Sequence, residues 1–224
     1  MKKTTPANET TIREEICRIG QRMWQRGFVA GNDGNISVRL GPGRYLCTPT
    51  GVSKGFMTPK MLCVIDDDAR RLEGACEITS EIRMHLTVFR HCPDANAVVH
   101  AHSPHATAYA ITGREVPANV MPEMEVVVGP VPLAPYAIPG SPGVSEGLRP
   151  HLRKGIYAVL LAHHGPVTWG RTLDEAYFRL EKLDLYCQTL LLADRLGGAK
   201  PLGEAEIRKI LQKKQAMGFD DPRL

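Results

Sequence analysis

The sequence predicts an α/β fold built around one central sheet. Its 224 residues, 43% hydrophobic and 23% charged, suit one domain that buries a full core and still carries a cleft. Strand-like and helix-like segments alternate along the chain without a fixed repeat, and no linker-like stretch divides it. We therefore expect residues 1–224 to form a single domain, of which residues 1–9 are flexible.

The first predicted element is an amphipathic helix over residues 11–26. Apolar side chains recur there at helical spacing, which is typical of a helix with one buried face. Thr11 and Glu14 have the spacing of a capping box, and Gly27 provides the stop. This face is expected to be ordinary core.

Extended segments and a second helix follow. A polar, glycine-rich turn is expected at residues 31–39, an extended segment at residues 44–50 and a short strand at residues 62–65, which ends in an aspartate-rich turn. Thr79 or Ser80 is then expected to cap a helix that runs to about residue 91, because either side-chain oxygen can accept from a free amide of the first turn. Glu81 falls in that first turn.

The second half of the chain predicts a similar mixture. Strands are expected at residues 97–102 and 157–162, and helices at residues 104–112, 173–196 and 204–217. Ser103 and Pro104 suit a helix start, and Thr172 with Glu175 forms a capping box. Between the two strands, a loop rich in proline and glycine surrounds a strand-like segment, EVVVGPVPLAPYA.

Composition excludes several classes of protein. The chain has no apolar run of membrane-spanning length and no apolar stretch after its first lysines, so we expect a cytoplasmic protein without membrane contacts. Its six cysteines form no CxxC pair, which favours reduced structural thiols. The net charge of +4 is spread along the chain, which favours small anions as ligands and argues against nucleic acid.

Two histidine motifs predict a metal site. In VVHAHSPH, His100 and His102 are two residues apart on a predicted strand, so their side chains emerge on the same face. His164 follows the apolar strand before Gly165, while His163 is expected to point to the other side. Three imidazoles suit a catalytic zinc ion, and they also suit other divalent metals. The alternative is a structural role, in which these histidines are simply hydrogen-bonded near the core.

Glu81 and three polar turns are the other candidates. A carboxylate beside a metal can serve as a fourth ligand or move protons, whereas a first-turn glutamate can also simply favour the helix dipole. Backbone amides and hydroxyls that can hold a phosphate occur in the turn GNDGN, in TPTG and at the start of the second helix. Each of these turns, taken alone, is also compatible with a plain turn.

In their order along the chain, the motifs GNISVR, TPTG, TSE, DANAVVHAH, APYA and HHG resemble those of the class II aldolase and adducin family. The resemblance covers nearly the whole chain. It implies a three-layer fold in which helices flank a mainly antiparallel sheet, and a homotetramer. It also implies zinc held by Glu81, His100, His102 and His164, and substrate phosphate bound by Gly34, Asn35, Thr50, Gly51, Thr79 and Ser80.

The activity implied by the resemblance is zinc-dependent aldol cleavage. The substrate would be a ketose 1-phosphate similar to L-fuculose 1-phosphate, the products dihydroxyacetone phosphate and a short aldehyde, and the acid and base Glu81. The chain departs from the family where catalytic tyrosines are expected, since it has NVMPEMEVVVG after VPA and QAMGF near its end. Glu123, Glu125 or a water is a candidate replacement.

These departures keep other activities open. The same scaffold hosts pentulose-phosphate 4-epimerases, sugar-acid phosphate decarboxylases and dehydratases, which are the alternatives to the aldolase. A non-catalytic, adducin-like association module is the least favoured member of the family, because all four candidate metal ligands are present. A nucleic-acid binder would need a clustered basic face, which the sequence lacks.

Overall fold

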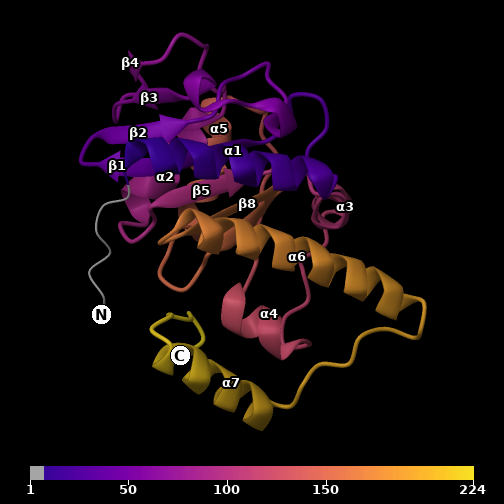
Figure 1. Cartoon of the computed structure of the whole chain (residues 1–224). Helices are drawn as coiled ribbons and strands as arrows, with labels where there is room; N and C mark the ends of the chain where they lie inside the picture. The colour runs from indigo at the N-terminus through magenta and orange to yellow at the C-terminus, as the bar shows by residue number, and fades with distance from the viewer. Residues whose placement is uncertain (1–7) are drawn as a thin grey trace.

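A computed structural model describes residues 8–224, and residues 1–7 lie outside the described part. The predicted flexibility of residues 1–9 therefore falls mostly on residues that the structure does not describe. Asn8 and Glu9 belong to an ordered helix start. The chain is organised around one eight-stranded sheet with helices on both faces (Figure 1).

The sheet is mixed but mainly antiparallel, as predicted. Its strand order is β4-β3-β2-β1-β5-β8-β7-β6, and every neighbouring pair is antiparallel except β6 and β7. The strands are β1 (Asn35–Gly41), β2 (Arg44–Cys47), β3 (Cys63–Ile65), β4 (Arg71–Glu73), β5 (Ala97–His100), β6 (Leu133–Ala134), β7 (Ala158–Leu161) and β8 (Gly165–Gly170). In this register Asn35 on β1 faces His100 on β5.

Helices cover the sheet on both faces and confirm the predicted three layers. They are α1 (Glu9–Gln25), α2 (Ile82–His91), α3 (Pro104–Thr112), α4 (Pro122–Val127), α5 (Pro142–Leu148), α6 (Leu173–Asp194) and α7 (Glu204–Ala216), with short 3-10 turns η1 (Lys54–Phe56), η2 (Pro59–Met61) and η3 (Arg149–His151). One core layer joins α1 and the first half of α6 to the sheet, and another joins α2 and α5 to the opposite face (Figure 1). A third cluster lies among α3, α4 and the rest of α6.

Several local predictions need correction. The side chain of Asn8, not Thr11, caps α1 by accepting from the amide of Thr10. The predicted strand at residues 97–102 ends at His100, because His102 turns away and its amide donates to the carbonyl of Phe28. Thr172 does cap α6, with 3.1 Å between the amide of Glu175 and the hydroxyl of Thr172, but the carboxylate of Glu175 accepts from the amide of Arg171 at 3.0 Å, so the capping box is only half formed.

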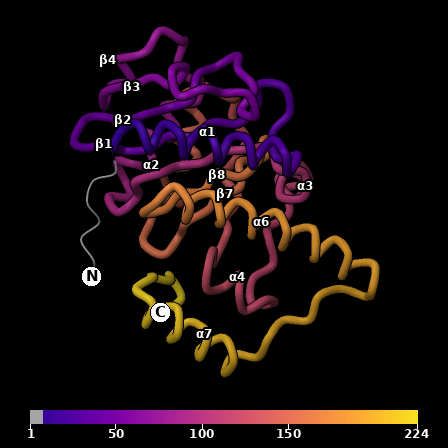
Figure 2. The backbone as a smooth tube through the Cα atoms, viewed as in Figure 1, coloured from indigo at the N-terminus to yellow at the C-terminus, as the bar shows by residue number. Residues whose placement is uncertain are grey.

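The strand predicted within EVVVGPVPLAPYA is wrong at its start, because residues 125–127 belong to helix α4, and only Leu133–Ala134 form a strand, β6. Pro122 occupies the first turn of that helix, where proline's missing amide hydrogen has no consequence. Met124 and Glu125 are buried, and α4 lies beside α7 and the chain end (Figure 2). Tertiary packing on one side therefore selects a helix for a segment whose valines favour a strand.

No helix within residues 8–224 is both long enough and apolar enough to cross a membrane.

Candidate metal centre and active site

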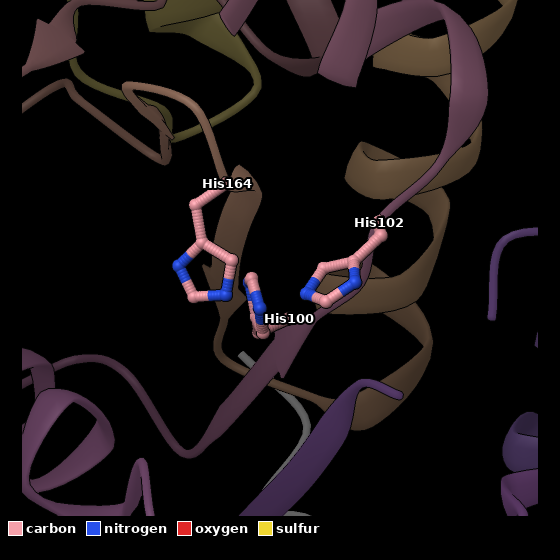
Figure 3. Close-up of side chains that lie close together, drawn as sticks. All are labelled: His100, His102 and His164. Atoms are coloured by element: carbon pink, nitrogen blue, oxygen red, sulfur yellow. The ribbon is translucent and has the colours of Figure 1, made fainter. Parts of the chain in front are cut away.

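Three histidines converge at the edge of the sheet where β5 ends and β8 begins. His100 is the last residue of β5, His102 follows two residues later, and His164 lies in the turn between β7 and β8. Their ring centroids are 4.6–5.1 Å apart, and one nitrogen from each lies within 4.8 Å of the others. Figure 3 shows the three rings facing a common point. His163, whose φ is 56°, is exposed and is not among the three histidines that converge.

Polar contacts of His100 and His102 direct one nitrogen of each of these two rings inward. His100 Nδ1 lies 2.9 Å from the carbonyl oxygen of Pro166, to which it donates, so its Nε2 lone pair faces the common point. His102 Nδ1 lies 3.3 Å from a carboxylate oxygen of Asp33. Metal-ligating histidines ordinarily donate their other ring N–H to a carbonyl or carboxylate in this way.

Glu81 completes the group of donors. Its two carboxylate oxygens lie 3.5 Å from His100 Nε2 and 3.4 Å from His164 Nε2. Two donors bound to one tetrahedral zinc ion at about 2.0–2.1 Å lie about 3.3 Å apart, so this spacing suits shared coordination. Glu81 Oε1, His100 Nε2 and His102 Nε2 are buried and have no hydrogen-bond partner among the described residues, so the site offers donors that a divalent ion would satisfy.

Burial keeps these imidazoles in the form that binds metals. Desolvation, together with the neighbouring His164 and His102, holds the pKa of His100 well below its ordinary value. Burial likewise lowers the pKa of His164, and the nearby Glu81 carboxylate opposes that shift only in part. Both rings are therefore neutral at neutral pH, with a lone pair available for a metal ion.

A buried polar chain holds Glu81 from behind. The side-chain amide of Asn35 donates to Glu81 Oε2 at 2.8 Å, and Asn35 Oδ1 lies 2.5 Å from His85 Nε2. Since Asn35 Oδ1 only accepts, His85 carries its proton on Nε2, and Ser37 Oγ donates to His85 Nδ1 across 2.5 Å. Burial lowers the pKa of His85 to about 3. Ser37, His85 and Asn35 are therefore uncharged at neutral pH, and Glu81 is the one charged member of this chain.

The segments predicted to bind phosphate come together beside this site. The amide of Thr79 donates to the carbonyl of Thr48 at 3.3 Å, and the amide of Thr50 donates to the carbonyl of Glu77 at 3.0 Å, so TPTG lies against the segment before α2. Thr48 in turn bonds to Ile36 on β1. All three predicted segments are thus neighbours, and contact with a phosphate stays a prediction.

The individual phosphate candidates differ in exposure. Thr50, Gly51 and Ser80 are exposed, whereas Gly34, Asn35 and Thr79 are buried. A Cβ at Gly34 would lie 2.9 Å from the carbonyl oxygen of His100, and φ of Gly34 is +72°. Only glycine therefore lets this turn approach the ligand-bearing strand so closely.

Neither glutamate proposed to replace the missing tyrosines is placed for that role within the chain. Glu123 is exposed at the start of α4. Glu125 is buried, accepts from the amide of Asn119 at 2.5 Å and pairs with Arg223 at 2.7 Å. Its contacts make it part of the attachment of the chain end to α4.

Sequence reasoning missed three residues around the centre. Asp33 and His85 orient His102 and Asn35, and Tyr136 lies edge-on to the ring of His163, with 5.9 Å between centroids. A polar residue at every second position of an otherwise apolar strand, as in NIS, is a signal that could have indicated the chain behind Glu81. Nothing in the sequence pattern singles out His85.

Comparison with known proteins gives consistent matches. Residues 14–191 match the family model described as Class II Aldolase and Adducin N-terminal domain. A 3-oxo-tetronate 4-phosphate decarboxylase of Cupriavidus necator is 36% identical over 80% of this chain and 82% of its own length. An L-fuculose phosphate aldolase of Methanococcus maripaludis is 34% identical over 81% and 96%. The crystal structure of YgbL from Escherichia coli, described as an aldolase/epimerase/decarboxylase, superposes with a TM-score of 0.84 at 34% identity, over 90% of this chain and 98% of that one.

Proposed function

The chain belongs to the class II aldolase and adducin family, and on this premise we propose that it is a divalent-metal-dependent decarboxylase of a phosphorylated 3-oxo sugar acid. The substrate class is that of 3-oxo-tetronate 4-phosphate. The observation that carries the proposal is the convergence of four donors, Glu81, His100, His102 and His164, where β5 ends and β8 begins. The aldolase expected from the sequence becomes the second candidate, because the decarboxylase relatives match at higher identity.

The chemistry of such a substrate explains why both activities suit one site. In a 3-oxo acid the carboxylate carbon C1 is attached to C2, next to the C3 carbonyl. When the C1–C2 bond breaks, C1 leaves as carbon dioxide and the electron pair passes to C2 and the C3 oxygen, which gives an enediolate. Protonation at C2 then yields dihydroxyacetone phosphate, the product that aldol cleavage of a ketose 1-phosphate would also release.

The residues of the chain supply what this reaction needs. A divalent ion held by the three histidines and Glu81 would act as a Lewis acid toward the C3 oxygen, where negative charge develops. Glu81, fixed by Asn35 at 2.8 Å, is the group we assign to passing a proton, taken up from water, to C2. The turns around Gly34, Gly51 and Ser80 would hold the phosphate through backbone amides and hydroxyls.

The missing tyrosines favour decarboxylation over aldol cleavage. Cleavage to an aldehyde requires a group that removes a proton from the hydroxyl of the departing carbon, a task suited to a tyrosine. A departing carboxylate has no such proton to lose, so decarboxylation works without that group. Contacts of Glu125 with Asn119 and Arg223 leave this glutamate unsuited as a substitute.

Zinc, the homotetramer, the cytoplasmic location and the single-domain boundary of residues 1–224 remain predictions. Zinc fits three imidazoles and one carboxylate, while other divalent ions fit them as well. Emission spectroscopy of the purified protein tests the metal, and light scattering coupled to gel filtration tests the assembly.

The experiment that tests the function compares two substrates through their distinct second products. The metal-loaded protein is incubated with 3-oxo-tetronate 4-phosphate or with L-fuculose 1-phosphate, and carbon dioxide and aldehyde are measured beside dihydroxyacetone phosphate. We expect carbon dioxide in a one-to-one ratio with dihydroxyacetone phosphate from the first substrate. Aldehyde release from the second substrate alone would instead establish the aldolase.

A further inference from the structure

Lys54 is a buried cation whose presence the metal centre does not explain. It begins η1, directly after the turn that contains Gly51, and only 1% of its surface is exposed. Its ammonium donates to two backbone carbonyl oxygens, that of Asn32 at 2.9 Å and that of Val52 at 2.6 Å. Asn32 lies in the turn GNDGN, and Val52 directly follows the turn TPTG; the sequence predicts both turns to bind phosphate.

The position of Lys54 is rigidly set. Its own carbonyl lies so close to α1 that a Cβ at Gly20 would come within 2.5 Å of it. Gly34 lies two residues after Asn32, and Gly51 directly precedes Val52. Both glycines have left-handed backbones, with φ of +72° and +68°, so each turn is fixed on one side by the ammonium and shaped on the other by a glycine.

The charge of Lys54 lacks a local counter-charge. Within residues 8–224, no carboxylate lies within ion-pair distance of its ammonium, and Asp33 acts on it only at longer range. Desolvation lowers the pKa of Lys54 to about 8, so the side chain is still mostly protonated at neutral pH. Burying an ammonium without a compensating anion makes folding less favourable. A neutral side-chain amide could bridge the same two carbonyls without this desolvation penalty, so bridging alone does not explain a lysine.

We propose that Lys54 is a specificity-determining residue of the phosphate site, where its ammonium holds the two turns together and supplies the positive charge that favours a phosphate dianion. The inference rests on the proposed function only in its choice of a phosphorylated substrate. The ammonium binds the carbonyls of the turns and does not itself contact the phosphate. Lys54 therefore acts by positioning the turns and by its electrostatic attraction for the phosphate. Its chemistry selects phosphorylated sugar acids over their unphosphorylated counterparts.

The test measures binding of inorganic phosphate to the metal-loaded protein by titration calorimetry, which does not depend on turnover. Lys54→Gln keeps two N–H donors for the carbonyls but removes the charge, and Lys54→Arg keeps the charge. Lys60→Gln, at an exposed lysine of η2, is the matched control. Circular dichroism and thermal melts establish that each variant is folded.

We expect Lys54→Gln to weaken phosphate binding by about tenfold or more, as loss of a nearby unit charge in a partly desolvated site should. Lys54→Arg should restore most of the affinity, and Lys60→Gln should leave it unchanged. If Lys54→Gln proves unfolded, loss of affinity in folded Lys54→Met together with its retention in Lys54→Arg supports the same conclusion. Equal affinity in wild type and either folded neutral variant, or no phosphate binding by the wild type, would overturn the proposal.

The outcome is separable from the fate of the proposed function. Phosphate binding that depends on Lys54, without carbon dioxide release from any phosphorylated 3-oxo acid, would leave this inference standing and remove the decarboxylase. Carbon dioxide release with equal catalytic efficiency in wild type and Lys54→Gln would retain the decarboxylase and contradict the role of Lys54.

Discussion

The amide of Asn35 offers the sharpest test of how the site is organised, because the resemblance and the structure assign it different tasks. The resemblance implies that Asn35 binds phosphate. In the structure its N–H donates to Glu81 and its oxygen faces His85, so both ends are engaged. The substitution Asn35→Leu keeps the size of the side chain, which is 3% exposed, and removes both hydrogen bonds.

The expected size of the effect follows from these two contacts. A hydrogen bond to a charged group contributes about 1.5–3 kcal/mol. If that energy holds Glu81 in its reactive position, its loss lowers kcat by roughly tenfold to a hundredfold. The stranded N–H of His85 should also lower the free energy of unfolding by about 1–3 kcal/mol.

The assay separates kcat from KM for carbon dioxide release from 3-oxo-tetronate 4-phosphate, with metal content measured in the same samples. We expect kcat to fall while KM changes by less than about threefold. Ser37→Ala, at the far end of the same chain, leaves both bonds of Asn35 in place and should lower kcat less than Asn35→Leu does. An increase in KM at unchanged kcat would refute the positioning role and return Asn35 to the phosphate.

Three further predictions concern the metal, the chain end and acid stability. His102→Ala should lose at least tenfold in metal affinity in competition with a chelator, and full retention of the ion would exclude His102 as a ligand. Lys214→Met removes the buried ammonium that lies 2.8 Å from Asp221, while Arg223 still pairs with that carboxylate at 2.7 Å, so the free energy of urea unfolding should fall by about 1.5–3 kcal/mol, the contribution of one hydrogen bond to a charged group; an unchanged free energy would contradict this. Burial lowers the pKa of His85 from 6.5 to about 3, so below about pH 6.5 the unfolded state binds a proton that the folded state does not, and stability falls as pH drops toward 3. Urea unfolding of wild type and His85→Gln between pH 7 and pH 4 should show the steeper loss in wild type, and parallel curves would argue against it.

The convergence of the three histidines was predictable because short-range pattern and chemistry agree there. His100 and His102 sit on consecutive same-face positions, and His164 follows a buried strand that the sheet places beside them. The expected strand over residues 97–102 stops early, yet His102 still reaches the cluster because Asp33 holds its ring. A period-two argument therefore predicted histidines that do come together, although it expected a longer strand than the structure has.

Other features depend on contacts between distant segments, which no local pattern contains. The valines of EVVVG favour a strand, but burial of Met124 and the ion pair between Glu125 and Arg223 stabilise a helix. The role of Asn35 depends on His85, fifty residues later in the sequence. Lys54 carries no motif at all, and only its two carbonyl partners reveal its relation to the turns.

The central claim is that a divalent ion held by Glu81 and three histidines supports loss of carbon dioxide from a phosphorylated 3-oxo acid. The most direct test measures carbon dioxide from 3-oxo-tetronate 4-phosphate with metal-loaded protein, with chelator-stripped protein and after the stripped protein is reloaded with zinc. We predict release by the loaded protein, loss on stripping and recovery on reloading. Release that persists undiminished in fully stripped protein, or aldehyde release from L-fuculose 1-phosphate as the sole activity of the loaded protein, would contradict the account.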